Sequence, residues 1–192
     1  LTTPFTMAQN NYETQWKSVS KLENEGKTKD AQKAVESIIV NARKEHNTAQ
    51  TVKSLLYKYK YAMVLEENSE LTIVNGLKTE IAQTAGVDKA VLQSILAELY
   101  FQYYNNNTWK FSNRTETDIK QSDDFRTWDL NTLFKEINSL YIASLSQKEA
   151  LQQTQLNTYL PILIPQKGST VFRPTLYDLL ANRAIDYFND DK

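Results

Sequence analysis

Apolar residues recur at helical spacing between residues 90 and 111. Leu92 and Leu96 mark one face of a helix, and Phe101 adds an apolar side chain on another side. A helix that is apolar on most of its sides must be covered on most of its sides. We therefore expect this stretch to form the central helix of the domain. It is predicted to stop at residues 105–107, since these three asparagines favour caps and turns over helix interiors.

The same periodicity, interrupted by short polar turns, predicts further helices on both sides of the central one. Scarce helix breakers agree with this pattern, because only 4 glycines and 4 prolines occur in 192 residues. The expected helices span residues 12–25, 28–46, 47–67, 69–86, 128–145 and 175–188, with short helical turns within 147–160.

Cap and turn residues set several of these boundaries. Gly26 follows the first helix, at a position where glycine commonly takes a left-handed conformation. Two pairs are typical of capping boxes, Asn47 with Gln50 and Thr175 with Asp178. The other predicted caps are Thr28, Ser69 and Asp88, and Gly86 is expected to end the fourth helix.

Helices joined by short turns pack antiparallel. The first pair resembles a tetratricopeptide (TPR) unit, since Trp16 lies in its first helix and Gly26 at its turn. The predicted fold is therefore all-α, with about seven main helices in TPR-like stacked antiparallel hairpins that form a right-handed solenoid-like array. We expect residues 1–11 to be a flexible N-terminal arm and residues 12–192 to be a single helical domain.

The net charge of −1, from 22 basic and 23 acidic residues, argues against nucleic acid as a partner. No apolar run approaches the roughly 18 residues of a membrane span. Cysteine is absent, which excludes disulfides, thiolate metal sites and a cysteine nucleophile. The chain also starts without methionine, so we expect it to be part of a longer protein or a processed form.

No catalytic, cofactor-binding or metal-binding residue is predicted, and we expect the chain not to be an enzyme. The single histidine, His46, has no partner at a known spacing and is interpreted as a residue near a helix C-terminus. Adjacent carboxylates do not face each other on a helix. They are interpreted as solvated charges at residues 66–67, 123–124 and 190–191.

The aromatic residues around the end of the central helix leave two interpretations open. They can line a groove for a peptide or a glycan, or they can form core, and the core is favoured because aromatic side chains dominate core burial. These residues are Tyr100, Phe101, Tyr103, Tyr104, Trp109 and Phe111.

Residues 108–127 lack a helical period and would be a long loop for a compact domain. We predict that the loop is ordered and packs on the surrounding helices, the last one included; binding of a partner is the alternative. Its large apolar residues are Trp109, Phe111, Ile119, Phe125 and Trp128, and its expected charged anchors are Arg114 and Arg126. The last helix then closes the domain, with Tyr187 and Phe188 as its contact to the next part of the chain.

Four stretches together resemble the N-terminal helical region of the large alpha-2-macroglobulin-like proteins of Bacteroidetes. They are residues 16–45, 97–117, 127–145 and 172–188. The resemblance implies a non-catalytic domain of an exported, periplasmic or cell-envelope protein that traps or inhibits proteases. It implies macroglobulin-type β-sandwich domains further along the same chain as partners, with proteases or envelope proteins as further partners.

The resemblance supplies no active residue at any numbered position. Any thioester must lie outside this chain, because a thioester needs a cysteine and the chain has none. The residues alone leave a second hypothesis, a free-standing TPR-like module that binds a protein or peptide. A third, an enzyme of unknown type, would require a deep pocket with converging carboxylates.

Overall fold

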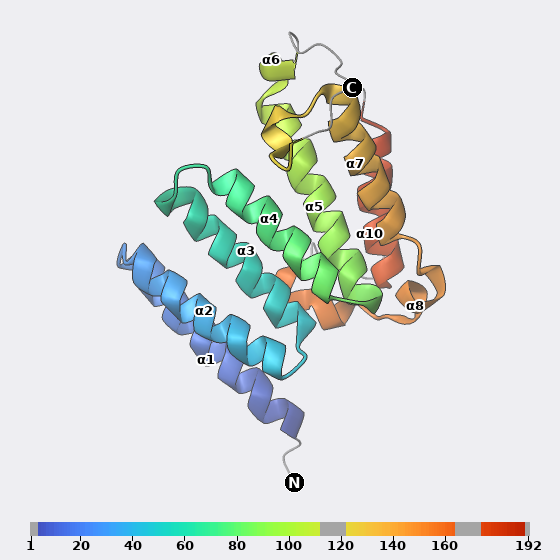
Figure 1. Cartoon of the computed structure of the whole chain (residues 1–192). Helices are drawn as coiled ribbons and strands as arrows, with labels where there is room; N and C mark the ends of the chain where they lie inside the picture. Colours follow the sequence, from blue (N-terminus) through green and yellow to red (C-terminus); the bar gives the residue numbers. More distant parts are fainter. Residues whose placement is uncertain (1–3, 112–121, 164–173, 191–192) are drawn as a thin grey trace. The chain divides into compact units, whose positions relative to one another are not determined.

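The computed structural model describes residues 4–111, 122–163 and 174–190, with side chains from Asn11 onward. Within these ranges the regular elements are all helices (Figure 1), and an isolated bridge joins Gln155 to Thr175. The predicted all-α helical array is confirmed. No helix in the described ranges is both long and apolar enough to cross a membrane.

The packing of the chain divides it into two compact units. Unit 1 comprises residues 1–69 and 158–164, and unit 2 comprises residues 70–157 and 165–192. This division is finer than the single domain expected over residues 12–192. The domain boundaries, and the flexible arm at residues 1–11, stay predictions.

Unit 1 contains α1 (Pro4–Asn24), α2 (Thr28–Lys44) and α3 (Thr48–Leu65), and α2 packs against both of the others. The apolar residues of α2 recur every three or four positions, so they form one buried stripe. The buried residues of α2 are Ala31, Val35, Ile38, Ile39 and Ala42.

Three boundary predictions in unit 1 need correction. The first helix begins at Pro4 and not at Tyr12, because proline suits a first turn, where its missing N–H costs nothing. Thr28 is the first residue of α2 and not its cap; the cap is Lys27, whose side chain makes no capping hydrogen bond. Asn47 does cap α3 by accepting from the Gln50 backbone N–H, but the capping box is incomplete, because the Gln50 side chain bonds Trp16 instead.

Gly26 joins α1 to α2 with a φ of +71°, in the left-handed region predicted for it. We expect Gly26→Val to lower the stability of the protein by about 1–2 kcal/mol, since a β-branched residue strains this conformation. Open space surrounds the position, with nothing within 4 Å of an added Cβ, so the effect would report backbone strain alone. Thermal unfolding measures it. Gly26→Asn is the control, because asparagine tolerates this region and should lose less; equal melting of wild type and the valine variant would contradict the argument.

Unit 2 begins within the first turn of α4, and the short η2 contributes residues to both units. Its elements are α4 (Ser69–Gln83), α5 (Gly86–Asn106), α6 (Thr108–Phe111), η1 (Phe125–Thr127), α7 (Leu130–Ser144), α8 (Lys148–Gln153), η2 (Leu156–Ile162) and α10 (Leu176–Phe188). The capping box predicted at the start of α10 is complete, with Thr175 and Asp178 bonding each other's backbone N–H.

The central helix of unit 2 is α5, which packs against α7, α8 and α10. It runs antiparallel to α7, since Tyr141 bonds Glu98 while Phe134 lies 4.8 Å from Tyr104. Leu96 is 1% exposed, as its place on the central helix requires. The prediction that Gly86 ends the fourth helix is wrong: Gly86, with a φ of +64°, is the first residue of α5. Helix α5 therefore has Ala85 as its cap, and Asp88, predicted as the cap, lies in its first turn.

Some large apolar residues that fit the helical pattern are exposed, because the buried stripes are narrower than the run of apolar positions. Leu56 and Met63 follow directly after the buried Leu55 and Ala62, and each step along a helix turns the side chain by about 100°. Others stand at helix ends, where packing stops. The exposed residues are Leu56, Met63, Leu130 and Phe188.

Candidate binding surface

The aromatic residues at the end of α5 are mainly core. Tyr100, Phe101, Tyr103 and Phe111 are buried, which agrees with the core interpretation. Tyr104 is half-buried, and Trp109 is 69% exposed, so the core interpretation is wrong for Trp109. It lies in the single turn of α6, which turns Phe111 inward and leaves Trp109 outside.

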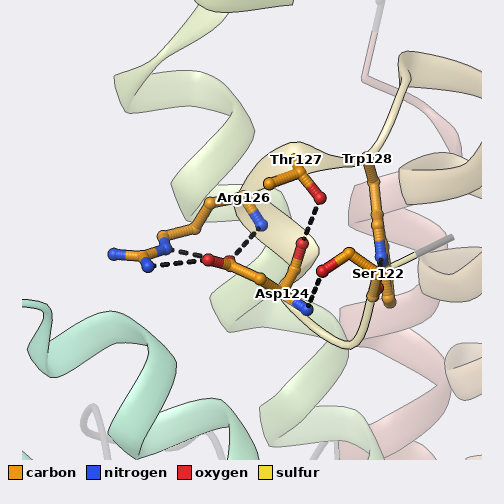
Figure 2. A network of polar contacts seen from close by, with 5 residues as sticks. All are labelled: Ser122, Asp124, Arg126, Thr127 and Trp128. Carbon is orange, nitrogen blue, oxygen red and sulfur yellow. Dashed lines mark hydrogen bonds and ion pairs between the residues drawn. The ribbon is translucent and has the colours of Figure 1, made fainter.

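Residues 122–128 are ordered by a local network of polar contacts, drawn in Figure 2. The Asp124 carboxylate accepts from the backbone N–H of Arg126 and from its Nε and Nη2, at 2.7–3.0 Å. Thr127 Oγ1 donates to the Asp124 carbonyl, and Trp128 Nε1 donates to the Ser122 carbonyl, both at 2.7 Å. The guanidinium holds the pKa of Asp124 below its usual value. Arg126 is thus an anchor, as predicted, for a carboxylate two residues away.

Packing of this segment on α5 is confirmed where the structure describes it. The Phe125 ring lies 5.1 Å from Tyr100 and 4.9 Å from Tyr103, and Trp128 lies 5.7 Å from Tyr100. Arg114 and Ile119 lie outside the described residues. Packing of the loop against the last helix stays a prediction.

Polar side chains in unit 2 connect its helices. The Glu98 carboxylate of α5 accepts from the Tyr141 hydroxyl of α7 at 3.0 Å and lies 3.6 Å from Nη2 of Arg183 in α10. Arg183 Nε also donates to the buried hydroxyl of Ser94 at 3.0 Å. Burial raises the pKa of Tyr141, so its hydroxyl keeps the proton that it donates. These contacts hold three helices together.

The two residues of the last helix that were predicted to contact another part of the chain differ in their burial. Tyr187 is buried at 3% exposure and donates to Asn138 Oδ1 at 2.7 Å, so it belongs to the core of unit 2. Phe188 is 50% exposed, and Ile185 beside it is 55% exposed. Only the outer residues can therefore meet another part of the chain.

In unit 1, side chains join α1 to α3 at a nearly constant separation along the sequence. Trp16 Nε1 donates to Gln50 Oε1 at 2.7 Å, 34 residues away. Further along both helices, Glu23 accepts from Tyr61, 38 residues away, and from Lys60, 37 residues away. A constant separation means that α1 and α3 run parallel in register. This is the relation that a 34-residue helical repeat produces between the first helices of successive hairpins.

Between these two parallel helices lies a hollow of about 280 Å³, which we call the α1–α3 groove. Trp16 and Tyr57 form its aromatic part, with ring centroids 4.7 Å apart. Lys53 Nζ lies over the Trp16 ring, 4.2 Å from its centroid, a cation–π arrangement. The groove is lined by Glu13, Trp16, Lys17, Ser20, Glu23, Lys53 and Tyr57.

The charges around the α1–α3 groove are paired with one exception. Lys17 bonds Glu13 and Lys60 bonds Glu23, each at 2.7 Å. For Lys53, no carboxylate of the described residues is within salt-bridge distance, and burial lowers the pKa of its ammonium group. An amine whose charge is poorly solvated and unpaired favours an incoming anion.

The sequence pattern did not identify this groove. Trp16 is half-buried at the groove wall, and Lys53 and Tyr57 are half-buried beside it, without a local signal in the sequence that brings the three together. The available signal was the 34-residue separation of Trp16 from Gln50, which places them at the same level of parallel helices.

A second hollow, of about 670 Å³, follows the outer side of α7. Its lining is mostly small or amide side chains, and its one charged residue, Lys135, is exposed. Phe134 and Ile142 are its large apolar residues. Its Asn138 side chain accepts from the Tyr187 hydroxyl, so this polar group already has a partner within unit 2.

The remaining candidates do not form a site among the described residues. His46 is exposed, with a φ of +52°, two residues beyond the end of α2. Glu66 and Glu67 are exposed, as the interpretation of solvated charge predicts. Within the ranges that the structure covers, no three acidic or histidine side chains gather as they would around a metal ion.

Tyr59 in unit 1 has a buried hydroxyl without a hydrogen-bond partner among the described residues. Burial raises its pKa from 10.0 to about 12, so the folded state holds the proton more tightly than the unfolded state. This contribution to stability is complete below pH 10 and is lost as the pH rises towards 12. We expect Tyr59→Phe to stabilise the protein by about 1 kcal/mol at pH 7, because it removes a buried unsatisfied group, and to reduce the alkaline loss of stability.

Denaturation at pH 7 and between pH 9 and 12 measures both effects. Tyr61→Phe is the matched control in the same helix, since Tyr61 donates to Glu23 and should lose stability when that bond is removed. Equal destabilisation by the two substitutions would contradict the assignment of Tyr59 as unpaired.

Comparison with protein-family models, with curated proteins and with solved structures finds no match to this chain.

Proposed function

We propose that this chain is the non-catalytic N-terminal helical domain of a large alpha-2-macroglobulin-like protein of the cell envelope, in which it supports protease trapping or inhibition. The proposal rests first on the resemblance of four stretches of the sequence to that region of such proteins. In this role the helices act as a scaffold, and the chemistry of trapping belongs to other domains.

The observation that carries the proposal is the use of the polar side chains. In unit 1, Tyr12, Trp16 and Tyr61 each donate to an acceptor on another helix or at its end. In unit 2, Tyr141 and Tyr187 do the same. Groups that could otherwise act on a substrate are engaged in holding helices together, which supports a scaffold over an enzyme.

The first test is the coding sequence beyond Lys192. We expect it to encode a long series of β-sandwich domains. A gene that stops shortly after Lys192, or continues into an unrelated domain, would overturn the proposal.

The second test uses the whole protein that the gene encodes, mixed with an active protease such as trypsin. A trapped protease is shielded from large substrates, so casein digestion should fall while cleavage of a small chromogenic amide continues. Loss of both activities would indicate an inhibitor that blocks the active site directly. No effect on either would remove the inhibitory role.

The α1–α3 groove favours a second candidate, a TPR-like module that binds a protein or peptide. The parallel register of α1 and α3 is the arrangement by which such repeats build a binding face. A helical domain of a larger envelope protein could also bind a peptide in this groove, so the two candidates are compatible. The coding sequence beyond Lys192 distinguishes a domain of such a protein from a free-standing module.

A further inference from the structure

We propose that the α1–α3 groove binds an extended acidic peptide segment, with one carboxylate of the peptide paired to Lys53 and a neighbouring side chain on the rings of Trp16 and Tyr57. This inference deepens the proposed function by naming a class of partner. It requires only that the chain binds other proteins, whichever parent protein it belongs to.

The pairing of charges in the groove leaves one cation for an anion to bind. The charged residues that line it, Lys17, Lys53, Glu13 and Glu23, sum to zero, but Glu13 is bonded to Lys17 and Glu23 to Lys60, which lies outside the lining. Lys53 is therefore the lysine of the groove whose charge no carboxylate of the described residues balances.

The position of Lys53 makes it more selective than an exposed lysine. Its ammonium group is held over the Trp16 ring, and the Trp16 ring is itself fixed by its hydrogen bond to Gln50. The ammonium group is therefore held in one position before the peptide binds. Binding then costs less side-chain entropy than it would for a freely moving lysine. A carboxylate is the matching acceptor, and a bond between two charged groups is stronger than a neutral one.

The shape of the groove selects an extended chain over a compact molecule. Its lining on α1 runs from Glu13 to Glu23, which at 1.5 Å per residue is about 15 Å. An extended peptide covers that length with about five residues. The half-buried rings of Trp16 and Tyr57 offer flat apolar surface to a peptide side chain beside the carboxylate.

The test is an array of immobilised pentapeptides with aspartate fixed at the centre and the other four positions varied. A matched array carries asparagine at the centre, so that each pair differs only in one charge. The folded protein is applied to both, and the peptides that bind best are then measured by fluorescence polarisation in solution. We expect the aspartate peptides to bind about tenfold more tightly than their asparagine partners.

Two lysine variants locate the site. Lys53→Met keeps most of the apolar length of the side chain and removes its charge, so it should abolish the preference for aspartate. Lys33→Met is the control, because Lys33 is an exposed lysine on α2 outside the groove, and it should bind as wild type does. Lys53→Glu should reverse the preference towards peptides with a central lysine.

Circular dichroism and melting confirm that the variants are folded, which separates loss of binding from loss of structure. Equal binding of aspartate and asparagine peptides would overturn the proposal, and so would equal behaviour of the Lys53 and Lys33 variants. Either result leaves the scaffold role in place, because that role depends on the coding sequence beyond Lys192. Conversely, a gene without β-sandwich domains would not alter the peptide result.

Discussion

Leu96→Ala is expected to destabilise unit 2 by about 2–5 kcal/mol, the range for a buried leucine whose cavity closes only in part. Leu96 is 1% exposed on α5, the helix that α7, α8 and α10 surround. With packing on several sides, the structure has little freedom to collapse into the space that the side chain leaves. Guanidinium denaturation followed by circular dichroism measures the loss.

Ile142→Ala is the control for this substitution. Ile142 is an aliphatic residue of α7, also in unit 2, but it is 64% exposed. Its truncation should change stability by no more than about 0.5 kcal/mol. Similar effects of the two substitutions would show that α5 is not the centre of unit 2.

Phe125→Ala is expected to cost about 3–5 kcal/mol, as truncation of a buried phenylalanine commonly does. Phe125 is 2% exposed, and its ring makes edge contacts with Tyr100, Tyr103 and Trp128. The substitution therefore removes the middle of an aromatic cluster. The same denaturation experiment measures the effect, with tyrosine and tryptophan near-ultraviolet circular dichroism as a local signal.

Trp109→Ala is the matched control, because it removes a larger aromatic side chain that lies 69% exposed in α6. We expect it to change stability by less than about 0.5 kcal/mol. If Trp109→Ala were as costly as Phe125→Ala, the segment around η1 would not be the part that covers α5. A small effect of Phe125→Ala would favour the alternative in which residues 108–127 await a partner.

The helices could be predicted from the sequence because their signals are local. Gly26 follows the first helix in the left-handed conformation expected of it, and Thr175 with Asp178 forms a capping box that four residues are enough to recognise. The stripe of α2 follows from spacing alone. Each of these features depends on neighbours within one or two turns.

Other predictions failed because partners distant in sequence decide them. Gln50 has the spacing of a capping box, but its side chain accepts a hydrogen bond from Trp16, 34 residues earlier. Leu56 fits the apolar pattern of its helix, yet the stripe that other helices cover is too narrow to include it. The position of Lys53 over an aromatic ring likewise depends on the register of two parallel helices, which no local pattern encodes.

The three tryptophans stand in three different surroundings. Trp16 belongs to unit 1, beside an ammonium group and Tyr57, whereas Trp128 is 8% exposed in unit 2 and Trp109 lies open to solvent. Replacing Trp109 by phenylalanine would leave one emitter in each unit. The emission wavelength and the quenching of tryptophan fluorescence would then report on the two units separately. They would show whether the units unfold in one cooperative step or in two. The same single emitter in unit 1 would also register occupation of the α1–α3 groove without any added label.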